Sequence, residues 1–233
     1  SGPNAVAARI DGFVDTELAV SRDTVSWTRF REPFIPRGHS DSWDWGMLFS
    51  DAPILHNDKL WFFYSGFNLN HNGHTARLWE SPYSAPSYSN KGLAVLRRDG
   101  YVSVEVTGFG HGTLTTHRFR QESGGSVQVN VDASAGELRY ELLLDTGEPI
   151  SGYTVADCDP IRADELDRTL SWNGVQDWPG VSSERQATLP NLPQSEFYIK
   201  IRFYLASGTK LYSFTLNPPE VTMWNVKIEG RID

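Results

Sequence analysis

The sequence has very little that favours helices, disulfides or membrane spans. Helical periodicity is almost absent from its 233 residues, and the best candidate for a helical turn is the short stretch Arg162–Arg168. The single cysteine, Cys158, excludes an internal disulfide. No apolar stretch approaches the length needed to cross a bilayer, and residues 1–9 carry no signal-peptide pattern. We therefore expect no membrane partner.

Signals for nucleic acids and nucleotides are also missing. The formal net charge is −8, and no cluster of Lys and Arg reverses it locally. The average surface therefore repels a polyanion, and we expect no nucleic-acid partner. The chain has no Gly-x-Ser-x-Gly elbow, phosphate-binding loop, dinucleotide fingerprint or N-glycosylation sequon.

Aromatic residues, in contrast, are abundant. They make up 12% of the chain, with eight Trp and nine Tyr. Such rings suit β-strands, where they pack on a pleated surface, and they also suit sugar binding, where they stack on pyranose faces. Packing is the commoner of the two roles.

Strand-like runs bounded by turn residues recur along the chain and predict an all-β fold. Polar and apolar residues alternate in several of them, so that Lys200 and Arg202 lie opposite an Ile and Phe face. The expected strands are residues 14–21, 47–55, 60–67, 93–106, 112–119, 126–131, 137–144, 169–172, 197–204 and 211–216.

A composition change near Gly108, Gly110 and Gly112 predicts a domain boundary. Residues 1–107 form a Trp-rich first domain, residues 108–217 an alternating β domain, and residues 218–233 a tail. The tail contains IEGR at residues 228–231, which matches a common engineered protease site. The first domain also contains an internal echo, LAVSRD at residues 18–23 and LAVLRRD at residues 93–99, which indicates a repeated strand–turn–strand unit.

These same segments resemble a known family. LAVSRDTVSW (18–27), APILHNDKLWFFYSG (52–66) and GLAVLRRDGYVSV (92–104) are similar to blade hairpins of five-bladed β-propeller glycoside hydrolases, the invertase and arabinanase superfamily. DCDPI (157–161), WNG (172–174) and LYSF (211–214) resemble motifs of the sandwich that follows the propeller in that group.

The resemblance implies an all-β fold in which β-propeller-blade hairpins are followed by an antiparallel β-sandwich. It further implies an extracellular or periplasmic C-terminal region or subunit of a glycoside-hydrolase-like protein, with a role in carbohydrate association and in support of a catalytic propeller. At most two blades precede Gly108, and the family's catalytic carboxylates have no counterpart here, so we assign no catalytic residue. Missing blades or a second chain are expected as partners. The alternative is a free-standing, oligomeric lectin-like or structural protein without catalysis.

Candidate binding residues fall in two groups. Trp43, Asp44, Trp45, Asp51 and His71 flank an expected inner strand and a polar loop, and we predict that they contact carbohydrate. The alternative is that the tryptophans fill the packing between blades and that Asp51 caps a turn.

The second group lies in one acidic stretch. Asp157, Asp159 and Asp164 could supply oxygen ligands for Ca²⁺, or they could form a solvated acidic turn. Cys158 sits among these carboxylates, which raise a thiol pKa, so we expect a buried structural residue rather than a nucleophile.

Overall fold

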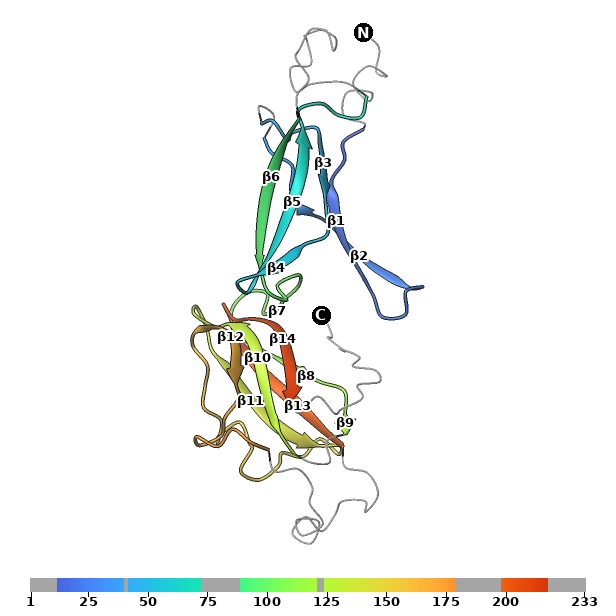
Figure 1. The fold of residues 1–233 in the computed structure, drawn as a ribbon. Helices are drawn as coiled ribbons and strands as arrows, with labels where there is room; N and C mark the ends of the chain where they lie inside the picture. Colours follow the sequence, from blue (N-terminus) through green and yellow to red (C-terminus); the bar gives the residue numbers. More distant parts are fainter. Residues whose placement is uncertain (1–11, 40–41, 73–88, 121–123, 179–197, 218–233) are drawn as a thin grey trace. The chain divides into compact units, whose positions relative to one another are not determined.

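We describe a computed structural model that places residues 12–39, 42–72, 89–120, 124–178 and 198–217. Within these ranges the chain forms fourteen β-strands and no helix, and the strands pair in antiparallel sheets (Figure 1). The predicted all-β character is therefore confirmed. The same residues include no helix of the length and apolarity that a membrane span requires.

The chain divides into two units between Tyr101 and Val102. The strands of the first unit are β1 (Thr16–Ser21), β2 (Trp27–Ile35), β3 (Met47–Ser50), β4 (Ile54–His56), β5 (Lys59–Phe67) and β6 (Ser89–Arg97). The strands of the second are β7 (Val104–Glu105), β8 (His111–Thr115), β9 (Phe119–Arg120), β10 (Ser126–Asp132), β11 (Leu138–Leu144), β12 (Asp164–Thr169), β13 (Tyr198–Ala206) and β14 (Lys210–Asn217).

In the first unit, β5 is the central strand of a sheet. It pairs with β6 along its whole length on one side, and with β3 and β4 in succession on the other. The turn from β4 to β5 is formed by Asn57 and Asp58, whose φ angles of 49° and 56° suit the two-residue hairpin turns with positive φ. One face of the sheet packs into a small core of Ile35, Leu48, Leu60 and Phe62.

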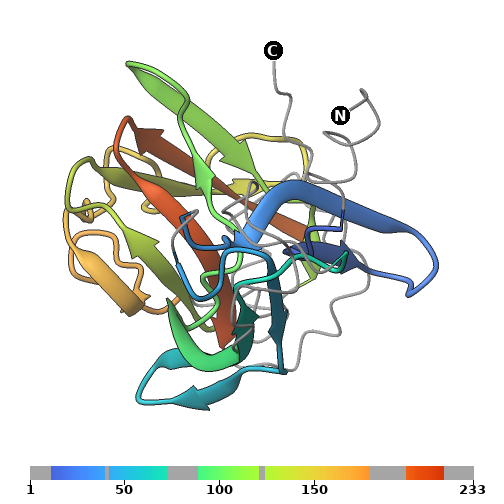
Figure 2. The same ribbon diagram turned by 90° about the horizontal axis from the view of Figure 1, so that it is seen from above.

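The β1–β2 hairpin forms a separate two-stranded sheet that extends away from the β3–β6 sheet (Figures 1 and 2). Its register shifts between Thr16 and Leu18, and Pro33 of β2 lies opposite Glu17. Asp23 fixes the turn, because its Oδ1 accepts hydrogen bonds from the backbone N–H groups of Val25 and Ser26 at 2.9 and 2.7 Å. These bonds favour the ionised carboxylate and lower the pKa of Asp23 to about 2.

The second unit contains two sheets, with strand orders β12-β10-β14-β7 and β11-β13-β8, and β9 also pairs with β13. Both sheets contribute to one hydrophobic core. Val129 and Val131 of β10 and Ile201 and Phe203 of β13 are at most 1% exposed. Burial of each such side chain contributes about 1.5–3 kcal/mol, so this core is the main source of stability in the unit.

The expected elements differ from the structure in several places. Residues 47–55, 93–106 and 112–119, each expected to be one strand, are interrupted and form β3 and β4, β6 and β7, and β8 and β9. The stretch Arg162–Arg168, expected to be a helical turn, mostly lies in strand β12, because Asp164–Thr169 pairs with β10. Of residues 169–172, expected to be a strand, only Thr169 lies in one, as the last residue of β12. Sequence periodicity missed this strand because its apolar residues are few, and the pairing with β10 determines its conformation.

The internal echo does not form the same structure twice. Its first copy is the β1–β2 hairpin. In the second copy, β6 runs into a turn at Asp99 and Gly100, but the following strand β7 pairs with β14 instead of returning to β6. The expected repeat is therefore wrong for its second half. Because of this pairing Val104 and Glu105 belong to the second unit, while the domain division into residues 1–107 and 108–217 stays a prediction.

Candidate functional site

The outer face of the β11-β13-β8 sheet carries a dense group of polar side chains. Along β13 the burial alternates strictly, so that Ile201 and Phe203 point into the core while Lys200, Arg202 and Tyr204 share the opposite face. The predicted placement of Lys200 and Arg202 opposite the apolar face is confirmed.

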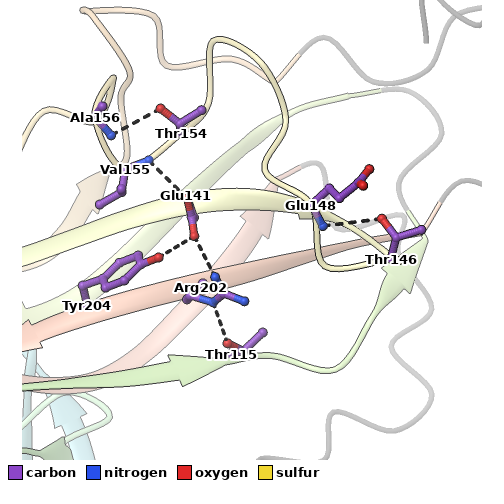
Figure 3. A network of polar contacts seen from close by, with 9 residues as sticks. All are labelled: Thr115, Glu141, Thr146, Glu148, Thr154, Val155, Ala156, Arg202 and Tyr204. Carbon is purple, nitrogen blue, oxygen red and sulfur yellow. Dashed lines mark hydrogen bonds and ion pairs between the residues drawn. The ribbon is translucent and has the colours of Figure 1, made fainter. Parts of the chain in front are cut away.

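A buried carboxylate lies at the centre of this face (Figure 3). Glu141 of β11 is only 2% exposed and lies directly opposite Arg202 in the strand register. Its Oε1 accepts hydrogen bonds from Arg202 Nη1 at 3.1 Å and from the Tyr204 hydroxyl at 2.5 Å, and its Oε2 from the Val155 backbone N–H at 3.4 Å. Such pairing is needed because an unpaired buried carboxylate is strongly destabilising.

The network also influences the protonation of Tyr204 and Arg202. Burial raises the pKa of the Tyr204 hydroxyl, and the Glu141 carboxylate acts in the same direction. The hydrogen bond with Tyr204 raises the pKa of the Arg202 guanidinium, and the charge of Glu141 adds to the effect. Tyr204 therefore remains a neutral donor and Arg202 remains a cation, while Arg202 Nε extends the network to Thr115 Oγ1 at 3.2 Å.

A hollow of about 440 Å³ lies next to this network and is lined by Thr115, Thr116, His117, Arg118, Asp145 and Lys200. Asp145 organises it. Its Oδ2 accepts a hydrogen bond from Arg118 Nη1 at 2.8 Å, its Oδ1 lies 3.5 Å from Lys200 Nζ, and its backbone carbonyl accepts a hydrogen bond from Lys200 Nζ at 2.7 Å. The guanidinium of Arg118 also lies over the ring of Tyr198, 4.6 Å from its centroid.

The backbone positions the hollow at the end of β8. Thr116 leaves the regular strand but remains bonded to β13, because its N–H donates to the Ile201 carbonyl at 2.9 Å and its Oγ1 accepts from the Ile201 N–H at 3.0 Å. Thr116 is only 7% exposed, and its two bonds to Ile201 anchor the segment that carries His117 and Arg118. The hollow thus rests on a rigid strand pair.

In the first unit, the structure brings together two of the residues predicted to bind carbohydrate. Trp43 stacks on Tyr64 with ring centroids 5.7 Å apart and planes inclined by 9°. Asp44 is 7% exposed and accepts hydrogen bonds from the Tyr64 hydroxyl at 3.1 Å and from the Ser42 hydroxyl. Burial, together with Asp44, raises the pKa of Tyr64. Gly66 permits this arrangement, because a Cβ there would lie 2.5 Å from the Trp43 ring.

The remaining three residues of that group lie elsewhere in the unit. Trp45 packs edge-on against Phe13 at 5.0 Å, and its carbonyl accepts a hydrogen bond from Arg37 at 2.7 Å. Asp51 and His71 are exposed, and their backbone N–H groups donate to Phe63 and Gly12. The side-chain contacts found among the described residues do not join Asp51 or His71 to Trp43 and Asp44. Binding of carbohydrate by the five residues stays a prediction.

Asp157 and Asp159, predicted to bind Ca²⁺, lie beside the turn at 171–174. Asp157 Oδ2 accepts hydrogen bonds from the N–H and hydroxyl of Thr154, and Asp159 Oδ2 accepts from the Ser171 hydroxyl at 2.6 Å and the Gly174 N–H at 2.9 Å. Asp164 lies at the start of β12. Within the described ranges, no group of three or more His, Cys, Asp or Glu side chains is arranged to hold a metal ion.

The same bonds join two motifs that are far apart in the sequence. The N–H of Asp159 donates to the Ser171 carbonyl, the N–H of Asn173 donates to the Asp157 carbonyl, and Cys158 bridges to Trp172 in the backbone pairing. Cys158 is 5% exposed, and its burial raises the pKa of the thiol. Residues 157–161 and 172–174 thus form one structural element, which contributes Cys158, Ile161 and Trp172 to the core.

Sequence reasoning missed both Glu141 and the hollow. The signal for Glu141 was a charged residue inside the apolar run of 137–144, where an acid is tolerated only with a partner. The hollow carried no such signal, because Arg118, Asp145 and Lys200 come from three separate segments that only the sheet pairing brings together.

The comparisons with known proteins give no match: no protein-family model, no curated protein and no solved structure resembles this chain closely enough to be assigned to it.

Proposed function

We propose that this chain is the C-terminal region or a subunit of an extracellular or periplasmic glycoside-hydrolase-like protein. In that protein it associates with carbohydrate and supports a catalytic propeller. The observation that carries the proposal is the polar hollow on the β8 and β13 face.

The lining of the hollow matches the chemistry of sugar hydroxyl groups, each of which both donates and accepts hydrogen bonds. Arg118 and Lys200 supply donors, Asp145 supplies acceptors, and the Thr115 hydroxyl supplies both. The ring of Tyr198 beside Arg118 adds an apolar surface of the kind on which a pyranose can stack. The volume is within the range typical of small-molecule sites. One or two sugar residues are therefore the ligand that this surface suits best.

The folds of the two units support the same proposal. Two antiparallel sheets that share one core are the arrangement expected of a β-sandwich, which we assign to the second unit. We assign the β1–β2 hairpin and the β3–β6 sheet of the first unit to propeller blades. A blade packs on its neighbours through both faces, so the proposal requires further blades as partners.

Carbohydrate binding can be tested with a glycan array followed by titration calorimetry on the best oligosaccharide. We expect Asp145→Asn to weaken binding by about tenfold or more, because it removes a charged acceptor and releases Arg118 and Lys200. Asp58→Asn is the matched control, since Asp58 forms a comparable exposed ion pair with Arg98 at 2.7 Å in the first unit.

Two results would contradict the proposal. One is the absence of binding to any oligosaccharide, and the other is an equal loss of affinity in the Asp145 and Asp58 variants. Binding through the hollow by a self-associated chain of this length, isolated from its native source, would instead favour a free-standing lectin-like protein.

A further inference from the structure

The β3–β6 sheet of the first unit is apolar on both faces. On the face that does not enter the small core, Trp61 of β5 lies opposite Ile54 and Val95, and Phe63 lies opposite Leu93. Phe49 of β3 lies opposite Ser65 on the same face. We call Phe49, Ile54, Phe63, Leu93 and Val95 the apolar face.

The described residues of the first unit leave the apolar face uncovered. Exposure is 56% for Ile54, 50% for Phe49, 47% for Phe63 and Val95, and 43% for Leu93. The opposite face of the same sheet contains Leu48, which is only 1% exposed. An antiparallel sheet with one solvated face normally carries polar residues on that face, so this pattern is typical of a sheet that is covered on both sides.

Cations border the apolar face at both ends. Lys59 precedes Trp61 by two residues and Lys91 precedes Leu93 by two, so strand alternation places both on this face. Both lysines are exposed, and Lys91 Nζ donates a hydrogen bond to Ser65 Oγ. The face also includes Arg97, opposite Lys59, and it is bordered at one edge by Asp51, whose N–H donates to the Phe63 carbonyl. The net charge of the face is therefore positive, although the whole chain carries −8.

This combination selects one kind of occupant. We propose that the apolar face docks a protein surface that is itself apolar and bordered by carboxylates. A second copy of the chain would bring Lys59 or Lys91 against cations of its partner when the sheets are aligned, and like charges at an interface are unfavourable. An anionic lipid surface would meet Asp51 at the edge, and a flat sheet face has no loop to insert into a bilayer.

The inference concerns the first unit and does not depend on carbohydrate binding by the second. It gives the chemistry of the partner that further blades or a second chain would have to present. A chain that binds no glycan would not contradict this inference. A failed docking test would not contradict the proposal that the hollow binds carbohydrate.

The test uses a charge-reversed copy of the chain as the probe. The double variant Lys59→Glu with Lys91→Glu presents the same apolar face bordered by carboxylates. Mixed with the wild-type chain and examined by sedimentation velocity and native mass spectrometry, it should form a heterodimer. We expect this heterodimer to form at concentrations about tenfold lower than either protein needs for self-association. Its affinity should fall as added salt screens the charges.

Matched controls separate the face from general electrostatics. Arg22→Glu with Arg31→Glu changes the net charge equally on the exposed β1–β2 hairpin and should give no heterodimer. Phe63→Ser in the charge-reversed copy should abolish the heterodimer while circular dichroism shows that the fold is kept.

Four outcomes would overturn the inference. They are no heterodimer at any accessible concentration, an equally tight wild-type homodimer, an equal response of the hairpin control, and binding of the wild-type chain to phosphatidylserine vesicles that Phe63→Ser abolishes.

Discussion

Glu141 of β11 lies directly opposite Arg202 of β13, and its buried Oε1 accepts a hydrogen bond from Arg202 Nη1 at 3.1 Å. The pair joins two neighbouring strands on the face that carries the hollow, and Thr115 connects it to a third strand. We therefore expect the rigidity of the proposed binding surface to depend on a carboxylate that is itself only 2% exposed.

Glu141→Gln tests this dependence. The neutral side chain leaves Arg202 without its counter-ion and places an amide donor near the Val155 N–H. We expect the free energy of unfolding to fall by about 1–3 kcal/mol in urea denaturation. Glu148→Gln makes the same change at an exposed residue, and its free energy of unfolding should stay within about 0.5 kcal/mol of the wild-type value. Equal effects of the two variants would show that the buried pair does not stabilise the sheet.

Tyr140 should make stability depend on alkaline pH. Burial raises the pKa of its hydroxyl to about 12, whereas an unfolded tyrosine titrates near 10. The folded state therefore retains a proton that the unfolded state loses. This contribution to stability is fully present below pH 10 and is lost as the pH rises through about 12. Urea denaturation at a series of pH values measures it.

The comparison for that experiment is Tyr140→Phe, which lacks the ionisable group. We expect stability to fall less steeply with alkaline pH in this variant than in the wild type. Tyr101→Phe, at a ring that is 37% exposed, should keep the wild-type slope. A slope that Tyr140→Phe leaves unchanged would contradict the expectation.

Gly66→Ala tests the close packing around Trp43. A Cβ at Gly66 would lie 2.4 Å from the Cβ of Asp44 and 2.5 Å from the Trp43 ring, and both are attached to backbone that cannot easily shift. We expect destabilisation of the first unit by about 1–3 kcal/mol, with a changed tryptophan emission. Ser65→Ala, the adjacent residue on the other face of β5, should have little effect. Normal stability in Gly66→Ala would show that Trp43 is free to move.

The sequence predicted those features that depend on local alternation. The valines of β10 and the polar face of β13 follow from residues spaced two apart, so the strands and their faces could be read directly. The pairing of β7 with β14 could not, because it joins Val104 to Leu211 and leaves no local trace. The helical turn expected at Arg162–Arg168 is wrong for a related reason, because pairing with β10 gives most of this stretch a strand conformation.

The candidate sites divide in the same way. Trp43 and Asp44 are adjacent in the sequence, and the structure keeps them together. The prediction that Asp51 and His71 share a site with them rests on an expected inner strand and a polar loop, and such a pattern does not determine position in a folded sheet. The burial of Glu141 depends on Arg202 and Tyr204, which are about sixty residues away in the chain.

Pro33 gives the β1–β2 hairpin a property that its exposure alone would not suggest. An exposed two-stranded ribbon offers its backbone to any extended segment that approaches it, which is how ordered aggregates grow. A strand added along β2 would meet Pro33, which has no N–H to donate. The extra residues at the two register shifts, Phe34 and residues 31–32, also lie in β2 and interrupt its regular ladder. The free edge of β2 is therefore a poor template for fibril growth.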